Sequence, residues 1–199
     1  MGCLSGLLLV LSLNGCKKNY ADVPKDQDNM ALLQKKSVER GQYLVASIGC
    51  MDCHSPKKMG PQGFEELPGL HLSGFPGDRP IPEPVPEALE KGWILMNHDL
   101  TAAAGPWGIS FASNLTSDET GIGNWNYEQF ERAIRQGKYK GMENGRMLLP
   151  PMPWQNFANL SDEDLRAIFD YLKSTKPVKN AVPAPVPPAQ AGEQTASLE

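Results

Sequence analysis

The segment Cys50-Met51-Asp52-Cys53-His54 has the pattern C-x-x-C-H, which is typical of covalent haem attachment. Two thiols at this spacing lie on one turn of a helix. Each can therefore form a thioether with a vinyl group of a porphyrin, while the adjacent imidazole binds the iron. The pattern predicts one covalently bound haem c, with Cys50 and Cys53 as attachment points and His54 as the proximal iron ligand.

Two closely spaced cysteines also occur in zinc sites and in redox-active dithiols, and both chemistries remain open but fit less well. A zinc site would need two more ligands, and His71 and His98 follow His54 at no recognised ligand spacing. A redox-active dithiol is expected between a strand and a helix and has no use for His54. A chance match is the remaining alternative, because the chain has 4 cysteines.

The composition is that of a small domain without a strong charge bias. The chain has 199 residues, of which 40% are hydrophobic, and its formal net charge is -4. This length fits one hydrophobic core, and the absence of a basic excess argues against a nucleic-acid partner.

The first residues predict export and lipid attachment. Residues 1–15 carry no charged side chain, and the apolar run 6–13 is too short to span a bilayer but suits a signal peptide. Leu13-Asn14-Gly15-Cys16 resembles a bacterial lipobox, so we expect cleavage before Cys16 and a diacylglyceryl group on its thiol. The product would be a lipoprotein of the bacterial cell envelope that faces the periplasm. A plain cleaved signal is the alternative, whereas an acylation start at Met1-Gly2-Cys3 is disfavoured by Gly6.

Polarity and periodicity divide the rest of the chain. Residues 16–36 are polar with little periodicity and are expected to be the lipid anchor and a tether, residues 37–178 the domain that carries the haem, and residues 179–199 a disordered Pro/Ala-rich tail. Ser37 is the expected cap of a first helix that delivers the cysteines. Its apolar side follows helical spacing at Val38, Gly41, Leu44, Val45 and Ile48.

Two further helices are expected from capping residues and apolar stripes. The first spans 126–136, with Asn126 as its cap and Gly137 as its end. The second follows Ser161, has three acidic residues in its first turn, and ends by Lys176. Its apolar stripe is Leu165, Ile168, Phe169 and Leu172. The Gly- and Pro-rich stretch 55–125 predicts an ordered loop around the haem edge, with a short helix near 86–91 and no strands.

The segment Pro150-Pro151-Met152-Pro153-Trp154 supplies the expected distal ligand. The prolines hold an extended backbone, so presenting the Met152 thioether to iron needs little further ordering. A sulfur ligand favours ferrous iron and leaves no position for oxygen or peroxide. Met147 is the nearest rival. The spacing of Met142, Met147 and Met152 also permits copper(I) binding, although packing is the commoner role of methionine.

Together these features resemble a class I cytochrome c: a first helix, the C-x-x-C-H motif, a long loop, a Pro-Met-Pro segment and an acidic-capped last helix. Three segments resemble more closely the exported bacterial cytochromes related to the haem subunits of membrane-bound dehydrogenases. They are Ser113-Asn114-Leu115-Thr116-Ser117-Asp118, Thr120-Gly121-Ile122-Gly123-Asn124-Trp125 and Leu148-Leu149-Pro150-Pro151-Met152-Pro153-Trp154. Those subunits carry several haems, whereas this sequence has one C-x-x-C-H motif.

The resemblance implies an all-α domain with the class I cytochrome c fold and a long loop insertion between the haem motif and the distal-ligand region. It also implies that the first and last helices cross beside the haem, with Gly41 close to Tyr171 or Phe169. Four side chains are candidates for binding the haem propionates, with ordinary packing as the alternative for the tryptophans. They are Asn114, Trp125, Arg146 and Trp154. Lys57 and Lys58 are either a docking patch or solvated surface residues.

The sequence therefore predicts an electron carrier with no substrate of its own, which passes one electron from a donor to an acceptor redox protein at a membrane face. Two other functions remain open. Without a methionine ligand, a five-coordinate haem could reduce peroxide or bind a gas. The chain could also be the haem subunit that holds a dehydrogenase at the membrane.

Overall fold

The structure is a computed structural model that describes residues 24–188. These residues form the α-helices α1 (Pro24–Ser47), α2 (Cys50–His54), α3 (Pro86–Glu90), α4 (Tyr127–Gln136), α5 (Trp154–Phe157) and α6 (Asp162–Ser174), with one 3-10 turn at Tyr139–Gly141. The strands are β1 (Lys57–Gly60), β2 (Gly63–Glu66), β3 (Leu95–Met96), β4 (Ala102–Gly105) and β5 (Gly108–Phe111). Within residues 24–188, no helix is long and apolar enough to cross a membrane. The expected signal peptide, Cys16 and residues 189–199 lie outside the described residues.

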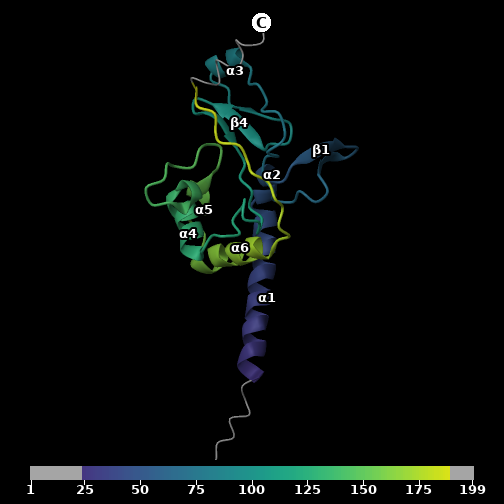
Figure 1. Ribbon diagram of the computed structural model, residues 1–199, viewed down its shortest axis with the longest axis vertical. Helices are drawn as coiled ribbons and strands as arrows, with labels where there is room; N and C mark the ends of the chain where they lie inside the picture. The colour runs from purple at the N-terminus through teal and green to yellow at the C-terminus, as the bar shows by residue number, and fades with distance from the viewer. Residues whose placement is uncertain (1–23, 189–199) are drawn as a thin grey trace, which may run out of the picture.

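The crossing of α1 and α6 organises the domain (Figure 1). A Cβ atom built on Gly41 would overlap the carbonyl oxygen of Ala167 and lie 2.7 Å from the Cβ of Tyr171, so only glycine permits this approach. Two polar contacts flank the crossing: Ser37 Oγ donates to Asp170 at 2.7 Å, and Arg40 Nε pairs with an Asp164 oxygen at 2.9 Å. The crossing beside Tyr171 is as predicted.

The core is built mainly from these two helices. The apolar stripe of α6 is buried as predicted, and so are Gly41, Leu44 and Val45 of α1. The buried cluster is Leu44, Val45, Leu72, Ile122, Phe130, Leu165, Ile168, Phe169 and Leu172. The predicted caps are also confirmed, because Asn126 accepts from the backbone N–H of Gln129 at 2.8 Å and Ser161 accepts from that of Asp164 at 3.1 Å.

The predicted start of the first helix is wrong. Helix α1 begins at Pro24, so the part of the expected tether from 24 to 36 is helical and Ser37 lies inside the helix. Residues 26–36 are exposed and project beyond the packed domain (Figure 1). They include two Lys, two Gln, two Leu, one Ala and one Met, which favour helix by intrinsic propensity without forming an apolar stripe. Periodicity therefore does not reveal this part of the helix.

The expectation of an all-α domain without strands is also wrong. Strands β1 and β2 form an antiparallel hairpin, and β3, β4 and β5 form a second antiparallel sheet. Each strand has 2 to 4 residues, and all four residues of β4 are buried, so neither length nor alternation marks it in the sequence. The short helix α3, in contrast, lies where the sequence predicts it.

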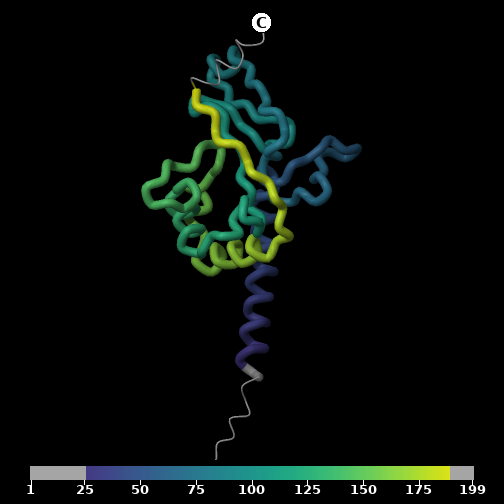
Figure 2. Tube along the Cα trace, in the orientation of Figure 1, coloured from purple at the N-terminus to yellow at the C-terminus, as the bar shows by residue number. Residues whose placement is uncertain are grey.

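The first residues of the expected disordered tail pack against the domain. The backbone of Val186 exchanges two hydrogen bonds with that of Ile109, at 2.8 and 2.9 Å, and its side chain is buried. Asn180 Nδ2 donates to the carbonyl oxygens of Ser73 and Phe75 at 2.7 and 2.9 Å. Figure 2 shows this yellow segment following the side of the sheet. The prediction of disorder is therefore wrong for residues 179–188, because prolines suit an extended chain at a sheet edge.

Candidate haem site

The C-x-x-C-H motif forms its own short helix, α2, at the end of α1. Gly49 has φ 79°, a left-handed conformation that ends α1 and redirects the chain. Cys50 and Cys53 stand three residues apart on α2, so their side chains share one face of the helix. Both are partly buried, and within residues 24–188 neither forms a disulfide. The arrangement leaves both thiols available for thioether bonds on one side of α2.

His54, at the end of the same helix, is held by a backbone carbonyl. Its Nδ1 lies 2.7 Å from the carbonyl oxygen of Ser113. With Nδ1 occupied as the donor, Nε2 is the nitrogen left to bind a metal, which is the usual second interaction of a metal-bound histidine. Burial lowers the pKa of the His54 imidazole, and this favours the neutral form that iron requires.

The surroundings of the two thiols do not fit a zinc site or a redox-active dithiol. Burial raises the pKa of Cys50 to about 11, and burial also raises the pKa of Cys53, against the opposing charge of Lys57. A redox-active dithiol needs the reverse, a lowered thiol pKa. Among residues 24–188 no cluster of three or more His, Cys, Asp or Glu residues could hold a metal ion, as a zinc site would require. The residues fit covalent haem c better than either alternative.

Backbone contacts lock the motif to two distant segments, and sequence reasoning missed them. Ser55 is completely buried, and its Oγ accepts from the N–H of Leu72 at 3.0 Å. The N–H of Gly74 donates to the carbonyl of His54 at 2.8 Å, and that of Leu115 donates to the carbonyl of Leu72 at 2.9 Å. These contacts join residues separated by at least 17 positions in the chain, so no local pattern could have revealed them.

Met152 lies on another element, the loop between the 3-10 turn and α5. It is partly buried between two exposed prolines, and Ser110 Oγ donates to the carbonyl of Pro150 at 2.7 Å. Its rival Met147 is 44% exposed and pairs through its backbone with Lys138. Burial therefore favours Met152 over Met147 as a side chain turned into the domain.

The residues expected near the haem propionates have different surroundings. Asn114 is buried, and its amide is engaged with Thr116, Thr120 and the carbonyl of Val178, so it is part of the scaffold. The Arg146 guanidinium is exposed, with its centre 3.8 Å from the centre of the Tyr139 ring.

The two tryptophans are partly buried. The ring of Trp154 covers Gly137, where a Cβ would overlap the indole. Trp125 packs against the main cluster. Packing is therefore a sufficient reason for both tryptophans.

A buried carboxylate that was not predicted from the sequence, that of Asp99, lies close to the haem motif. Asp99 is completely buried, pairs with Arg79 at 2.6 Å and accepts from Thr101 Oγ1 at 2.6 Å. Burial alone would raise the pKa of Asp99, but the hydrogen bonds from Thr101 and Arg79 outweigh it and the pKa is lowered.

The two lysines after the haem motif differ in their surroundings. Lys57 is half-buried and its ammonium donates to three backbone carbonyls, so it is not a freely solvated surface residue. The interpretation of Lys57 as a solvated lysine is therefore wrong, whereas its part in a docking patch stays a prediction. Lys58 is exposed, as expected of a surface lysine.

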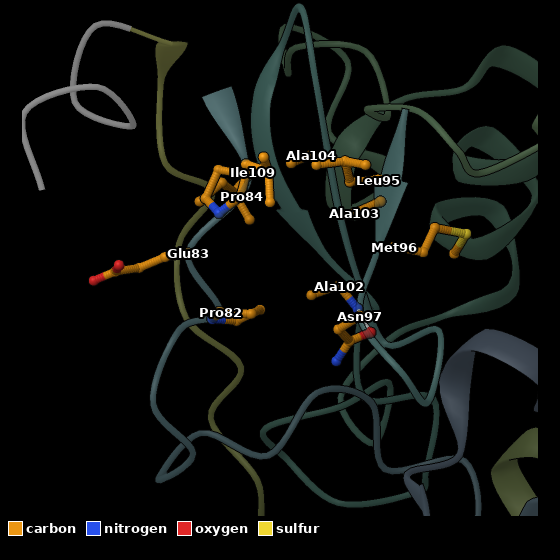
Figure 3. A pocket seen from close by; sticks show the side chains of 11 residues that line it. Pro82, Glu83, Pro84, Leu95, Met96, Asn97, Ala102, Ala103, Ala104 and Ile109 are labelled. Carbon is orange, nitrogen blue, oxygen red and sulfur yellow. Dashed lines mark hydrogen bonds between the residues drawn. The ribbon is translucent and has the colours of Figure 1, made fainter. Parts of the chain in front are cut away.

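A separate cavity of about 260 Å³ lies beside the three-stranded sheet (Figure 3). Its wall combines β3, β4, Ile109 of β5 and the proline-rich segment before α3, with Ala102 and Pro82 on opposite sides (Figure 3). None of the predicted site residues lines it. The cavity therefore does not belong to the haem site.

Comparison with known proteins agrees with the site. The family described as Cytochrome c matches residues 38–176. The gluconate 2-dehydrogenase cytochrome c subunit of Pantoea cypripedii is 31% identical over 82% of this chain and 28% of its own length. The fructose dehydrogenase cytochrome subunit of Gluconobacter japonicus is 28% identical over 80% and 25%, respectively. The quinone-dependent alcohol dehydrogenase cytochrome c subunit of Gluconobacter oxydans is 29% identical over 71% and 22%.

The chain thus spans about a quarter of the length of these relatives, which are themselves cytochrome subunits of dehydrogenases. The family match covers the haem motif, the last helix and the part of the first helix that packs against it. The chain belongs to the cytochrome c family, and the residues of its C-x-x-C-H motif fit covalently bound haem c.

Proposed function

We propose that this chain carries a single haem c with His54 and Met152 as axial ligands and passes one electron at a time between two redox proteins. The observation that carries the proposal is the hydrogen bond from His54 Nδ1 to the Ser113 carbonyl. His54 lies on the same helix, α2, as both cysteines. The hydrogen bond orients Nε2 for iron, and iron bound in this way cycles between its ferric and ferrous states.

Two further observations support the ligands and the number of haems. The 199 residues contain one C-x-x-C-H motif, so they provide covalent attachment for one haem. Met152 is partly buried in a loop whose Pro150 carbonyl is fixed by Ser110, whereas Met142 and Met147 are 58% and 44% exposed. A thioether opposite His54 would close the iron to small ligands.

We further propose that Cys16 carries the lipid and holds the domain at the periplasmic face of a bacterial membrane. The proposal rests on the lipobox-like sequence 13–16. The Cys16→Ala variant should lose its acyl chains and leave the membrane fraction, because removal of this one thiol removes the attachment point of all the acyl chains on that residue. Recovery of the unaltered protein entirely in the soluble periplasmic fraction would contradict the anchor.

A second candidate function is the haem subunit of a dehydrogenase. It is favoured by the names of the relatives, which are cytochrome subunits of gluconate, fructose and alcohol dehydrogenases. Under this proposal the electron donor is a dehydrogenase subunit that stays bound. Gentle extraction followed by size-exclusion chromatography separates the two functions, because a free carrier elutes alone and a subunit elutes with a large partner.

The electron-transfer proposal is tested on the purified holoprotein. Haem should remain on the polypeptide through acid-acetone extraction and denaturing electrophoresis, because thioether bonds survive both. The ferric spectrum should contain the weak long-wavelength band of methionine bound to iron, and the ferrous protein should resist carbon monoxide. Haem release would contradict covalent attachment, and rapid carbon monoxide binding would favour the five-coordinate alternative.

A further inference from the structure

Lys57 occupies a special position immediately after the haem motif. Its Nζ donates to the carbonyl oxygens of Asp52, Ser55 and Asp99, the latter two at 2.9 and 3.1 Å. Asp52 and Ser55 lie on either side of Cys53 and His54, so the ammonium is held at the carboxyl end of α2. This is the end of the helix that carries the proximal ligand.

The position of Lys57 is fixed from a second side by Asp99. The backbone N–H of Lys57 donates to Asp99 Oδ2 at 3.3 Å, and Asp99 itself is anchored by Arg79 and Thr101. The carboxylate charge of Asp99 is thus balanced by Arg79. Among residues 24–188 the Lys57 ammonium has only carbonyl oxygens as hydrogen-bond partners, so its positive charge is not cancelled by a carboxylate in contact.

We propose that Lys57 raises the reduction potential of the haem by holding a fixed positive charge beside the proximal histidine. Reduction of ferric to ferrous iron removes one positive charge from the site. A cation held nearby therefore repels the oxidised form more than the reduced form and raises the potential. The inference rests on the proposed binding of iron by His54, but not on the identity of the sixth ligand.

Lys58 provides the matched control. It is the next residue on β1, stands opposite Glu65 in the hairpin, and is exposed. Its charge is equal to that of Lys57, but it is solvated and screened by salt. The charge of Lys57 is half-buried and tied to the backbone of the haem motif. The two lysines therefore carry the same charge but differ in their exposure and in their contact with the haem motif.

The test is a potentiometric titration of the holoprotein carrying Lys57→Met, Lys57→Arg or Lys58→Met. Lys57→Met should reduce the ferrous-to-ferric ratio at fixed potential by about three- to tenfold, where tenfold corresponds to about 59 mV for one electron. Lys57→Arg should stay near the unaltered protein because it keeps the charge, and Lys58→Met should change the ratio by less than about twofold because its charge is screened. Thermal unfolding and the ferric absorption spectrum show whether each variant keeps its fold and ligands.

Equal shifts for Lys57→Met and Lys58→Met would overturn the proposal, since the effect would be one of total charge. So would a Lys57→Arg variant that behaves like Lys57→Met, because hydrogen bonding and not charge would then matter. An unchanged potential in Lys57→Met would overturn it as well. Failure of the unaltered protein to titrate reversibly as a haem protein would instead overturn the proposed function.

Discussion

Asp99 and Arg79 form an ion pair 2.6 Å long in which the Asp99 side chain is completely buried and the Arg79 side chain is 23% exposed. The pair lies between the segment that follows the haem motif and the start of β4. Asp99 Oδ2 accepts a hydrogen bond from the backbone N–H of Lys57, and Asp99 Oδ1 accepts hydrogen bonds from the side chains of Thr101 and Asn97. One buried charge thus ties two parts of the domain together.

Replacement of this carboxylate should destabilise the protein strongly. Breaking a buried ion pair from one side costs about 3–5 kcal/mol, and the partial exposure of Arg79 places Asp99→Asn near the lower end, about 3 kcal/mol. The free energy of unfolding from urea titration measures the loss. Asp78, which precedes Arg79 in the chain and is exposed, is the control. The free energy of unfolding of Asp78→Asn should stay within about 0.5 kcal/mol of that of the unaltered protein. Equal losses in both variants would contradict a special role for Asp99.

The same pair predicts a pH dependence of stability. Because the pKa of Asp99 is lowered from 3.8 in the folded state, its stabilisation is complete above pH 3.8 and is lost as the pH falls through the folded value. The stability difference between the unaltered protein and Asp99→Asn should therefore shrink below pH 3.8. Urea titrations at neutral pH and in acid measure it, and a difference that grows in acid would contradict the lowered pKa.

The helix crossing predicts an unusual sign for a glycine substitution. In an exposed helix Gly→Ala adds about 1 kcal/mol of stability. At Gly41, however, the new methyl group would overlap the carbonyl oxygen of Ala167, so Gly41→Ala should destabilise by about 1–3 kcal/mol or more. The melting temperature should fall accordingly, whereas Gln42→Ala at the next, exposed position should change it little. A stabilised Gly41→Ala variant would disprove the close approach.

The sixth ligand is tested by two methionine variants. Met152→Ala should lower the reduction potential and let the ferrous protein bind carbon monoxide rapidly, since the thioether that favours ferrous iron is lost. Met147→Ala should have neither effect, because the Met147 side chain is exposed and its removal does not free a coordination position on the iron. Potentiometry and carbon monoxide mixing measure both effects. The reverse result would assign the ligand to Met147.

Ser110 should control how firmly the Met152 loop is held. Its buried hydroxyl donates to the Pro150 carbonyl at 2.7 Å and accepts from Trp107 Nε1 at 3.2 Å. Ser110→Ala leaves both partners unsatisfied, which costs about 1–3 kcal/mol, and carbon monoxide should then enter the ferrous protein faster. Ser174→Ala removes a hydroxyl that bonds only within α6 and is the control for the binding rate. Equal rates of carbon monoxide binding in the two variants would show that Ser110 does not influence the distal ligand.

Local patterns predicted the parts of this protein whose reasons are local. The stripes of α4 and α6 and the Asn126 and Ser161 caps each follow from neighbours a few residues away. The haem motif is likewise contiguous. Its assignment needed only five adjacent residues. The close approach of Gly41 to Ala167 and Tyr171, by contrast, was implied only by the family resemblance.

The rest depends on partners far away in the chain. Strand β5 exists through its pairing with β4 and with Val186, and the buried place of Asp99 depends on Arg79, 20 positions before it. The carbonyl that orients His54 belongs to Ser113, 59 positions after it. Side-chain identity carries no sign of such contacts, because any residue offers a backbone carbonyl.

The contact between α1 and α6 also determines when this protein can fold. Ser37 and Asp170, which bond across the crossing, are 133 positions apart, so the central core closes only after nearly the whole domain has been synthesised. Contacts of such long sequence separation slow folding because the loop must be ordered first. Cys50 and Cys53 leave the ribosome well before α6 does. The two thiols therefore precede in the chain the helix that completes the core, and the core cannot close beside them until α6 is available.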